Sequence, residues 1–125
     1  MTPPVPASPE QQAARKLLHG GAQRQPIRWV NAPQPPMTIS RYRVAVGDTV
    51  SRHVHTGKAE YWLVVRGQGE VSLGDERIAV VEGDVVVTPP LVPHALRNTG
   101  SEVLDFLNLV QPVGNTTITT TELGI

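Results

Sequence analysis

Three histidines and one glutamate are the residues of this sequence whose types and spacing could support chemistry. His53 and His55 lie two positions apart in a β-branched, extended context, and side chains two apart on a strand share one face. Glu60 follows a short turn, so an antiparallel return of the chain would bring its carboxylate beside both imidazoles. His94 begins a later strand-like run behind a proline-rich turn, and that run could face the first pair across a barrel. Imidazole and carboxylate are the usual ligands of divalent iron, manganese, nickel, copper or zinc.

Ordinary packing is the competing interpretation of these residues, because a lone histidine on a strand is more often a packed or surface residue than a ligand. Here three of the four histidines fall into one pattern with a carboxylate, and the fourth, His19, is expected at a helix end. The chain has no cysteine, which excludes disulfides and thiolate ligands. The sequence contains no Ser-His-Asp set, phosphate loop or nucleotide fingerprint. The grouping therefore favours a metal site.

Short β-strands are the elements that must position these residues. Across residues 37–110 the sequence alternates β-type runs with Gly-Asp, Thr-Gly and Pro-Pro turns, a spacing typical of sandwiches and closed barrels. The segment 71–80 predicts a tight hairpin, since its central Gly-Asp tolerates the backbone that such turns require. We expect an all-β protein in which residues 37–112 form a jelly-roll barrel.

The two ends of the chain differ from this central region. Residues 1–36 are expected to form a proline-rich N-terminal arm with one short helix, in which Ser8 is the N-cap and Pro9 the first helical residue. The helix is expected to end at Gly20 and Gly21. Residues 113–125 are rich in threonine and either add an edge strand or stay loose.

Two stretches of the sequence resemble the signatures of the cupin superfamily. Residues 47–67, GDTVSRHVHTGKAEYWLVVRG, resemble the first signature, and residues 83–98, GDVVVTPPLVPHALRN, resemble the second. The short gap between them resembles that of small bacterial single-domain cupins. The one departure is Leu91, where the second signature usually has a turn glycine. This departure concerns the geometry of the turn and leaves His94 in its place.

The resemblance implies a double-stranded β-helix that holds one divalent metal ion per chain. It implies four ligands, namely His53, His55, Glu60 and His94. On a roughly octahedral ion, four protein ligands leave two positions for water, substrate or dioxygen. A closed tetrahedral zinc site with a structural role is the alternative.

Alternation along the strands predicts which side chains share the interior with the metal. Counting from Glu60 places Trp62 and Val64 on the same inward face, although ordinary core filling is the competing interpretation of Trp62. We also expect Val85 and Val87 to line the pocket wall. By the same counting Leu96 shares the face of His94. The predicted pocket is therefore mostly apolar.

Three functions remain open, because this fold hosts many chemistries. The first is an iron-dependent oxygenase or dioxygenase acting on a small organic substrate, which the open metal positions and an apolar wall favour. The second is an isomerase, lyase or decarboxylase that uses the ion as a Lewis acid. The third is a non-enzymatic cupin that binds a small ligand. An oxidoreductase is the favoured enzyme class.

Composition limits the partners of the chain. The 11 basic and 11 acidic side chains are scattered and give a net charge of +0, so nucleic-acid binding is disfavoured. No apolar run approaches the roughly 18 residues of a membrane span, and the N-terminus has no signal-peptide pattern. We therefore expect a cytoplasmic protein with a small-molecule substrate. We also expect a homodimer, since barrel-type cupins are commonly dimers and the N-terminal arm could pack across a two-fold axis.

Overall fold

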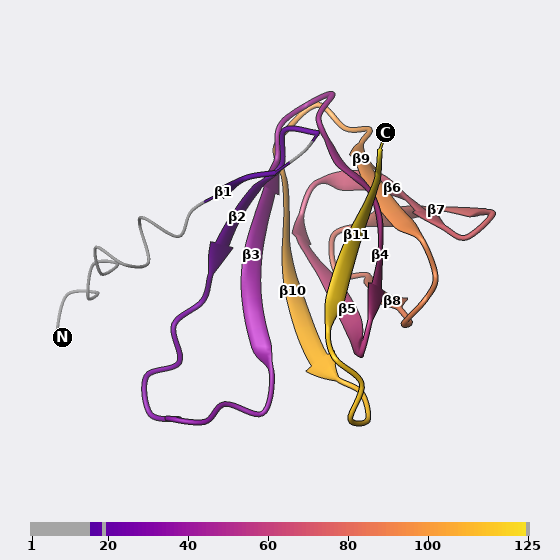
Figure 1. Ribbon diagram of the computed structural model, residues 1–125. Helices are drawn as coiled ribbons and strands as arrows, with labels where there is room; N and C mark the ends of the chain where they lie inside the picture. The colour runs from indigo at the N-terminus through magenta and orange to yellow at the C-terminus, as the bar shows by residue number, and fades with distance from the viewer. Residues whose placement is uncertain (1–15, 19, 125) are drawn as a thin grey trace, which may run out of the picture.

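Two antiparallel β-sheets face each other in the computed structural model of the chain, which describes residues 16–18 and 20–124 (Figure 1). The first sheet contains, in spatial order, β1 (Lys16–Leu17), β2 (Gln23–Pro26), β3 (Thr38–Val44), β10 (Leu104–Pro112), β5 (Lys58–Arg66) and β8 (Val85–Thr88). The second contains β11 (Thr119–Gly124), β4 (Thr49–Thr56), β9 (His94–Asn98), β6 (Gln68–Leu73) and β7 (Glu76–Val81). The expected all-β jelly-roll fold is confirmed.

The interior between the sheets changes from apolar to polar along the strands. On β5 the inward positions run from Val64 and Trp62, which are buried in the core, to Glu60. On β10 they run from Phe106, whose ring centroid lies 5.2 Å from that of Trp62, to Asn108. Burial of the apolar end stabilises the fold by roughly 25 cal/mol per Å² of apolar surface removed from water. The polar end of the interior contains the side chains that could form a functional site.

The N-terminal helix expected from the sequence is not supported, and no helix occurs among the described residues. Lys16 and Leu17 form β1, which pairs antiparallel with β2; residues 1–15 and His19 lie outside the described part of the chain. Gly20, where the helix was expected to end, lies in a turn instead. Its φ is +96°, and a Cβ there would lie 2.6 Å from the Thr49 carbonyl oxygen. An edge strand offers unpaired N–H and C=O groups, and pairing with them outweighs the weak propensity of so short a helix.

The C-terminal segment adds the edge strand that was one of two alternatives for it. β11 pairs antiparallel with β4, with Thr120 opposite His55. The strand begins at Thr119, and the carbonyl of Thr117, two residues earlier, accepts a hydrogen bond of 2.8 Å from the Thr56 hydroxyl at the end of β4. The tail thus covers one side of the strand that carries two of the histidines. The described residues include no helix long and apolar enough to cross a membrane.

Leu91 occupies the turn where the resemblance would place a glycine, and its backbone shows the consequence. It is the only non-glycine residue with positive φ among those described, at +67°. Its side chain is 70% exposed, while its N–H donates to the His55 carbonyl at 2.8 Å. The left-handed region costs a residue with a Cβ about 1–2 kcal/mol, and glycine avoids that cost. The left-handed conformation of Leu91 therefore lowers the free energy of unfolding.

Leu91→Gly is expected to stabilise the fold by about 1 kcal/mol, because relief of the left-handed strain exceeds the added entropy of glycine in the unfolded chain. Urea unfolding should show a higher midpoint with an unchanged slope. The matched control is Leu91→Ala, which also removes the exposed side chain but keeps the Cβ. A glycine variant no more stable than the alanine variant would show that the turn carries no strain.

Candidate metal centre

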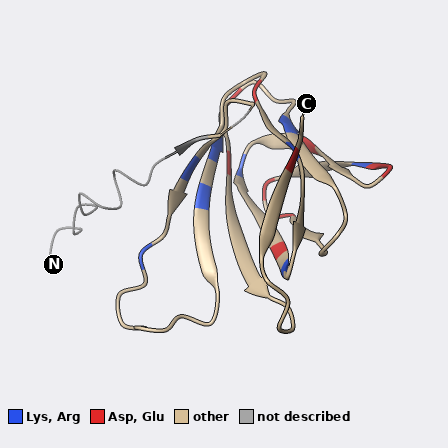
Figure 2. Ribbon diagram, in the orientation of Figure 1, with Lys and Arg blue, Asp and Glu red and all other residues tan. Residues whose placement is uncertain are grey.

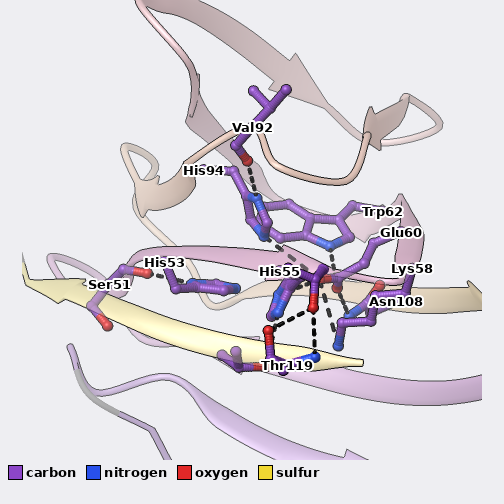
Figure 3. A network of polar contacts seen from close by, with 12 residues as sticks. Ser51, His53, His55, Lys58, Glu60, Trp62, Val92, His94, Asn108 and Thr119 are labelled. Atoms are coloured by element: carbon purple, nitrogen blue, oxygen red, sulfur yellow. Dashed lines mark hydrogen bonds and ion pairs between the residues drawn. The ribbon is translucent and has the colours of Figure 1, made fainter. Parts of the chain in front are cut away.

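Four side chains from three strands converge in the polar end of the interior (Figure 3). His53 and His55 come from β4, Glu60 from β5 and His94 from β9. One potential ligand atom from each lies within 4.8 Å of those of the other three. His55, Glu60 and His94 are 6%, 2% and 1% exposed, and His53 is half-buried. The structure therefore brings together all four residues that the sequence singled out.

The route by which the chain brings them together differs from the expectation in two respects. Glu60 does not lie beside the histidines in a ladder; after Gly57 the chain crosses from one sheet to the other, so Glu60 faces them from the opposite sheet. His94 does not face them across the barrel but pairs directly with His53 in the neighbouring strand. Gly57 has a φ of +73°, and a Cβ there would lie 2.6 Å from the Thr116 carbonyl. The corner therefore requires glycine.

Hydrogen bonds to the outer ring nitrogens orient the three imidazoles. His53 Nδ1 donates to the Ser51 carbonyl at 2.7 Å, and His94 Nδ1 donates to the Val92 carbonyl at 3.0 Å. A carbonyl oxygen only accepts, so in each of these rings the proton is on Nδ1 and the neutral form has its lone pair on Nε2. The third ring is held by its Nδ1 contact of 2.9 Å with the Thr120 hydroxyl. Such outer contacts are typical of metal-binding histidines.

The Glu60 carboxylate is held by one oxygen and presents the other to the histidines. Its Oε2 accepts hydrogen bonds from Asn108 Nδ2 and, at 3.3 Å, from Trp62 Nε1. Its Oε1 lies 2.7 Å from His55 Nε2 and 3.5 Å from His94 Nε2. Figure 3 shows these side chains directed toward one another. The two donors fix the orientation of the carboxylate and leave Oε1 available as a ligand.

Three of the atoms at the centre of the cluster have no aligned hydrogen bond within the described part of the chain. These atoms are His55 Nε2, His94 Nε2 and Glu60 Oε1, all fully buried. The 2.7 Å contact between Oε1 and His55 is close enough for an ion pair but lacks the alignment of a hydrogen bond. Leaving a buried polar atom unsatisfied costs about 1–3 kcal/mol. Buried lone pairs directed at one point fit a divalent cation, so this His₃Glu cluster could bind a metal ion.

The electrostatics of the cluster favour an ionised Glu60 and a neutral His53. Burial opposes ionisation of Glu60, but the His55 and His94 rings and the charge of Lys58 outweigh it and hold the pKa of the carboxyl well below its usual range. Burial lowers the pKa of His53, and the neighbouring imidazoles lower it further. The hydrogen bond to the Ser51 carbonyl raises this pKa but does not outweigh the other two effects. Carboxylate and neutral imidazole are the ligand forms of these groups.

A cavity of about 400 Å³ opens beside the cluster, within the usual range for small-molecule sites. His53, His55 and Glu60 line it. Most of its other walls are polar, and include Arg24, Ser40, Tyr42, Ser51, Lys58 and Asn108. Sequence reasoning missed these residues as site residues. Alternation from Glu60 would have found Lys58, whereas Arg24 is brought in by the pairing of β2 with β3, which no local signal predicts.

None of the five residues predicted for the pocket wall lines this cavity. Trp62, Val64 and Leu96 are 2% exposed and belong to the core, as the competing interpretation of Trp62 had it. Trp62 still serves the site through its hydrogen bond to the carboxylate.

The inward orientation expected for Val85 and Val87 is wrong, since both are exposed. In the ladder Val86 lies opposite Trp62 and Thr88 opposite Glu60. Directly paired residues share one face of a sheet, so Val86 and Thr88 point inward and the two valines between and beside them point outward. The inward positions predicted on β8 were therefore wrong by one residue.

Asn108→Leu is expected to weaken metal binding about 10- to 100-fold, the usual cost of losing a residue that orients a ligand. Leucine has a similar size but cannot donate to Glu60 Oε2. The affinity for Co²⁺, measured by competition with a chelator, gives the result. The control is Gln111→Leu on the same strand, which removes an exposed hydrogen bond with Tyr61 and should leave the affinity unchanged. Equal affinities in the two variants would rule out the positioning role of Asn108.

Comparison with known protein families and structures places these observations in a wider group. The Cupin_2 family profile, described as a cupin domain, matches residues 40–110. The barrel is also similar to the crystal structure of a cupin 2 conserved barrel domain protein from Salinispora arenicola, with a TM-score of 0.70 and 22% identity over 89% of this chain and 92% of that one. At that identity the likeness concerns the fold.

Two relatives of known name match the barrel region. The xanthan biosynthesis protein XanB of Xanthomonas campestris is 35% identical over 71 residues, which are 57% of this chain and 15% of that protein. The oxalate-binding protein of Thermotoga maritima is 28% identical over 72 residues, which are 58% of this chain and 60% of that protein. The matched segments thus span less than two thirds of these relatives, and about a seventh of XanB.

Proposed function

This chain belongs to the cupin family, and from that premise we propose that it is a mononuclear metal protein acting on a small polar molecule by Lewis-acid chemistry. His53, His55, Glu60 and His94 are the proposed ligands of one divalent ion. The reaction class is that of an isomerase, lyase or decarboxylase. The observation that carries this proposal is the set of buried, unsatisfied ligand atoms at the edge of a polar cavity.

The character of the cavity is what favours this reaction class over an oxygenase. The oxygenase expectation relied on an apolar wall suited to an apolar or aromatic substrate. The cavity instead presents hydroxyl, amide and charged side chains beside the cluster. Such groups bind oxygen-rich molecules by hydrogen bonds. The predicted apolar residues lie in the core or on the outer surface and give no support to an apolar substrate.

Each residue of the site has a distinct task in this proposal. A divalent ion bound here would polarise a carbonyl or carboxylate oxygen of the substrate. Glu60 supplies the negative charge of the ligand set, and its pKa, well below the usual range, keeps it ionised. Asn108 and Trp62 hold the carboxylate in place. The polar wall orients the substrate, and His55 and His94 hold the ion from the almost fully buried side of the site.

The two named relatives supply context for the substrate. The printed names refer to xanthan biosynthesis and to oxalate binding. Oxalate is a small, oxygen-rich molecule, and we propose the same broad class for the ligand of this chain. A cupin that binds such a ligand without turnover remains the alternative within the same site.

Anaerobic turnover tests the reaction class. Protein loaded with Mn²⁺, Ni²⁺ or Zn²⁺ would be incubated without oxygen with a panel of small hydroxy and oxo acids, and products followed by NMR. We expect product without oxygen, and none after chelation of the metal. A parallel oxygen electrode records any uptake by the Fe²⁺-loaded protein. Product that forms only with matched consumption of oxygen would reject Lewis-acid chemistry in favour of an oxygenase. Ligand binding without product would favour the non-enzymatic alternative.

A further inference from the structure

We propose that Arg24 and Lys58 form an oxyanion-binding subsite beside the ion of the proposed metal site, and that the ligand is a small, hydroxylated anion. The inference rests on the proposed function, because the ion supplies the third contact to such a ligand. It deepens that function by naming the charge of the molecule and the two side chains that recognise it.

The positions of the two cations are the first part of the argument. Lys58 lies two residues before Glu60 on β5 and therefore shares its inward face. Its Nζ is 4.0 Å from Glu60 Oε1, and its side chain is only 16% exposed. Arg24 lies on β2 opposite Tyr42 and lines the same cavity. Charged residues are otherwise scattered over the described strands (Figure 2). Two cations from different strands thus meet at one cavity next to the metal ligands.

The charge balance of the cavity is the second part. Its charged lining consists of Arg24, Lys58, Glu60 and Glu122. These formal charges, two positive and two negative, cancel. A divalent ion adds two positive charges, so the loaded site has an excess of two. Holding such an excess in a partly buried cavity is unfavourable unless an anion compensates it. Arginine and lysine both bind carboxylate and phosphate oxygens through charge-assisted hydrogen bonds.

An unsatisfied acceptor in the cavity wall is the third part. Asn108 is 3% exposed and lines the cavity. An ionised carboxylate only accepts hydrogen bonds, so Asn108 must turn its Nδ2 toward Glu60. Its Oδ1 is then left buried and without a partner in the described part of the chain. A hydroxyl group of the ligand would donate to this oxygen. The class that satisfies both features is a small carboxylate or phosphate that also carries hydroxyl groups.

Calorimetric titration of the Mn²⁺-loaded protein tests the inference directly. The probes are tartrate, a hydroxylated carboxylate; inorganic phosphate; and erythritol, a neutral polyol. We expect tartrate or phosphate to bind only when Mn²⁺ is present, and erythritol not to bind. The stronger of the two anions identifies whether a carboxylate or a phosphate group is recognised. Arg24→Gln should weaken that anion about 10- to 100-fold, as for loss of a charge-assisted hydrogen bond, and Arg24→Lys should retain part of the affinity.

Controls separate this subsite from the metal site. Arg28→Gln removes an exposed arginine four residues along the chain that does not line the cavity, and it should bind the anion as the parent does. Mn²⁺ affinity should be unchanged in Arg24→Gln. Should that variant fail to fold, Lys58→Met removes the second cation and is expected to weaken the anion similarly.

The outcomes are distinguishable. A fully loaded Arg24→Gln protein that binds the anion as tightly as the parent overturns the subsite. Loaded parent protein that binds neither anion also overturns it, while leaving the metal site intact. Parent protein that takes up no divalent ion overturns the proposed function itself.

Discussion

Replacement of His94 by alanine is expected to abolish stoichiometric metal binding while leaving the barrel folded. His94 is 1% exposed and presents Nε2 to Glu60 Oε1 at 3.5 Å. Loss of a residue that merely orients a ligand costs 10- to 100-fold in affinity, so loss of a ligand should cost more than about 100-fold. Trp62 and Phe106 lie on other strands, so most of the core remains in place. Equilibrium dialysis against Co²⁺ followed by elemental analysis measures the loss, and circular dichroism measures the fold.

The matched control for His94→Ala is a core variant on the same strand. Leu96 lies two residues further along β9, on the same inward face, and is 2% exposed. Leu96→Val removes a methylene from the core, which should cost about 0.5–1.5 kcal/mol of stability and leave metal binding intact. Retention of one tightly bound ion by a folded His94→Ala protein would show that His94 is not a ligand.

Acidification is expected to release the ion through protonation of the histidines rather than of Glu60. The pKa of the Glu60 carboxyl is held well below its usual range, so this ligand stays ionised in weak acid. The pKa of His53 is lowered from 6.5, so its competition with protons begins only below that value. Each imidazole that must lose a proton reduces the affinity roughly tenfold per pH unit below its pKa. Metal binding should therefore fall steeply in acid.

The free energy of unfolding of the metal-free chain should also decrease as the pH is lowered, in two steps. Both His53 and Glu60 have a lower pKa in the folded chain than in the unfolded chain, so the unfolded chain binds more protons and stability rises with pH. The contribution of His53 is lost as the pH falls below about 6.5, and that of Glu60 as it falls below about 4.5.

Metal content after dialysis between pH 8 and pH 4, with urea unfolding of the metal-free chain from pH 8 down to about pH 2, measures both effects. The Glu60→Gln variant provides the control, because it has no carboxyl group and its lower step in stability should disappear. Full metal content at every pH would contradict coordination by neutral imidazoles.

Much of the fold was predictable because its signals are local. Alternation of apolar residues and the regular Gly-Asp turns predicted short strands, and the hairpin of β6 and β7 formed where expected, with Leu73 opposite Glu76. The shared orientation of His53 and His55 was predictable for a similar reason, because side chains two apart on any strand lie on the same face. Glu60 and His94 were candidates from their places in the predicted strands, and the resemblance to the cupin signatures implied that they are ligands.

Three of the differences between prediction and structure arise where the pairing of distant strands determines the structure. The alternation of inward and outward side chains along one strand does not predict which residues of the next strand point inward. Val85 and Val87 were for this reason assigned to the wrong face. Local propensity favoured a helix near Lys16, but the free edge of β2 recruited that segment into the sheet. Arg24 lies far from the metal ligands in the sequence and reaches their cavity only because β2 pairs with β3. Each outcome depends on a partner strand that the local sequence does not specify.

The convergence of three imidazoles and one carboxylate on a single ion is the claim on which the rest depends. Elemental analysis of the chain, purified without added metal or chelator, tests it most directly when followed by titration of any metal-free fraction with Mn²⁺, Co²⁺ and Zn²⁺. We predict one divalent ion per chain in total. A chain that is isolated without metal and binds none of the three ions would contradict the account.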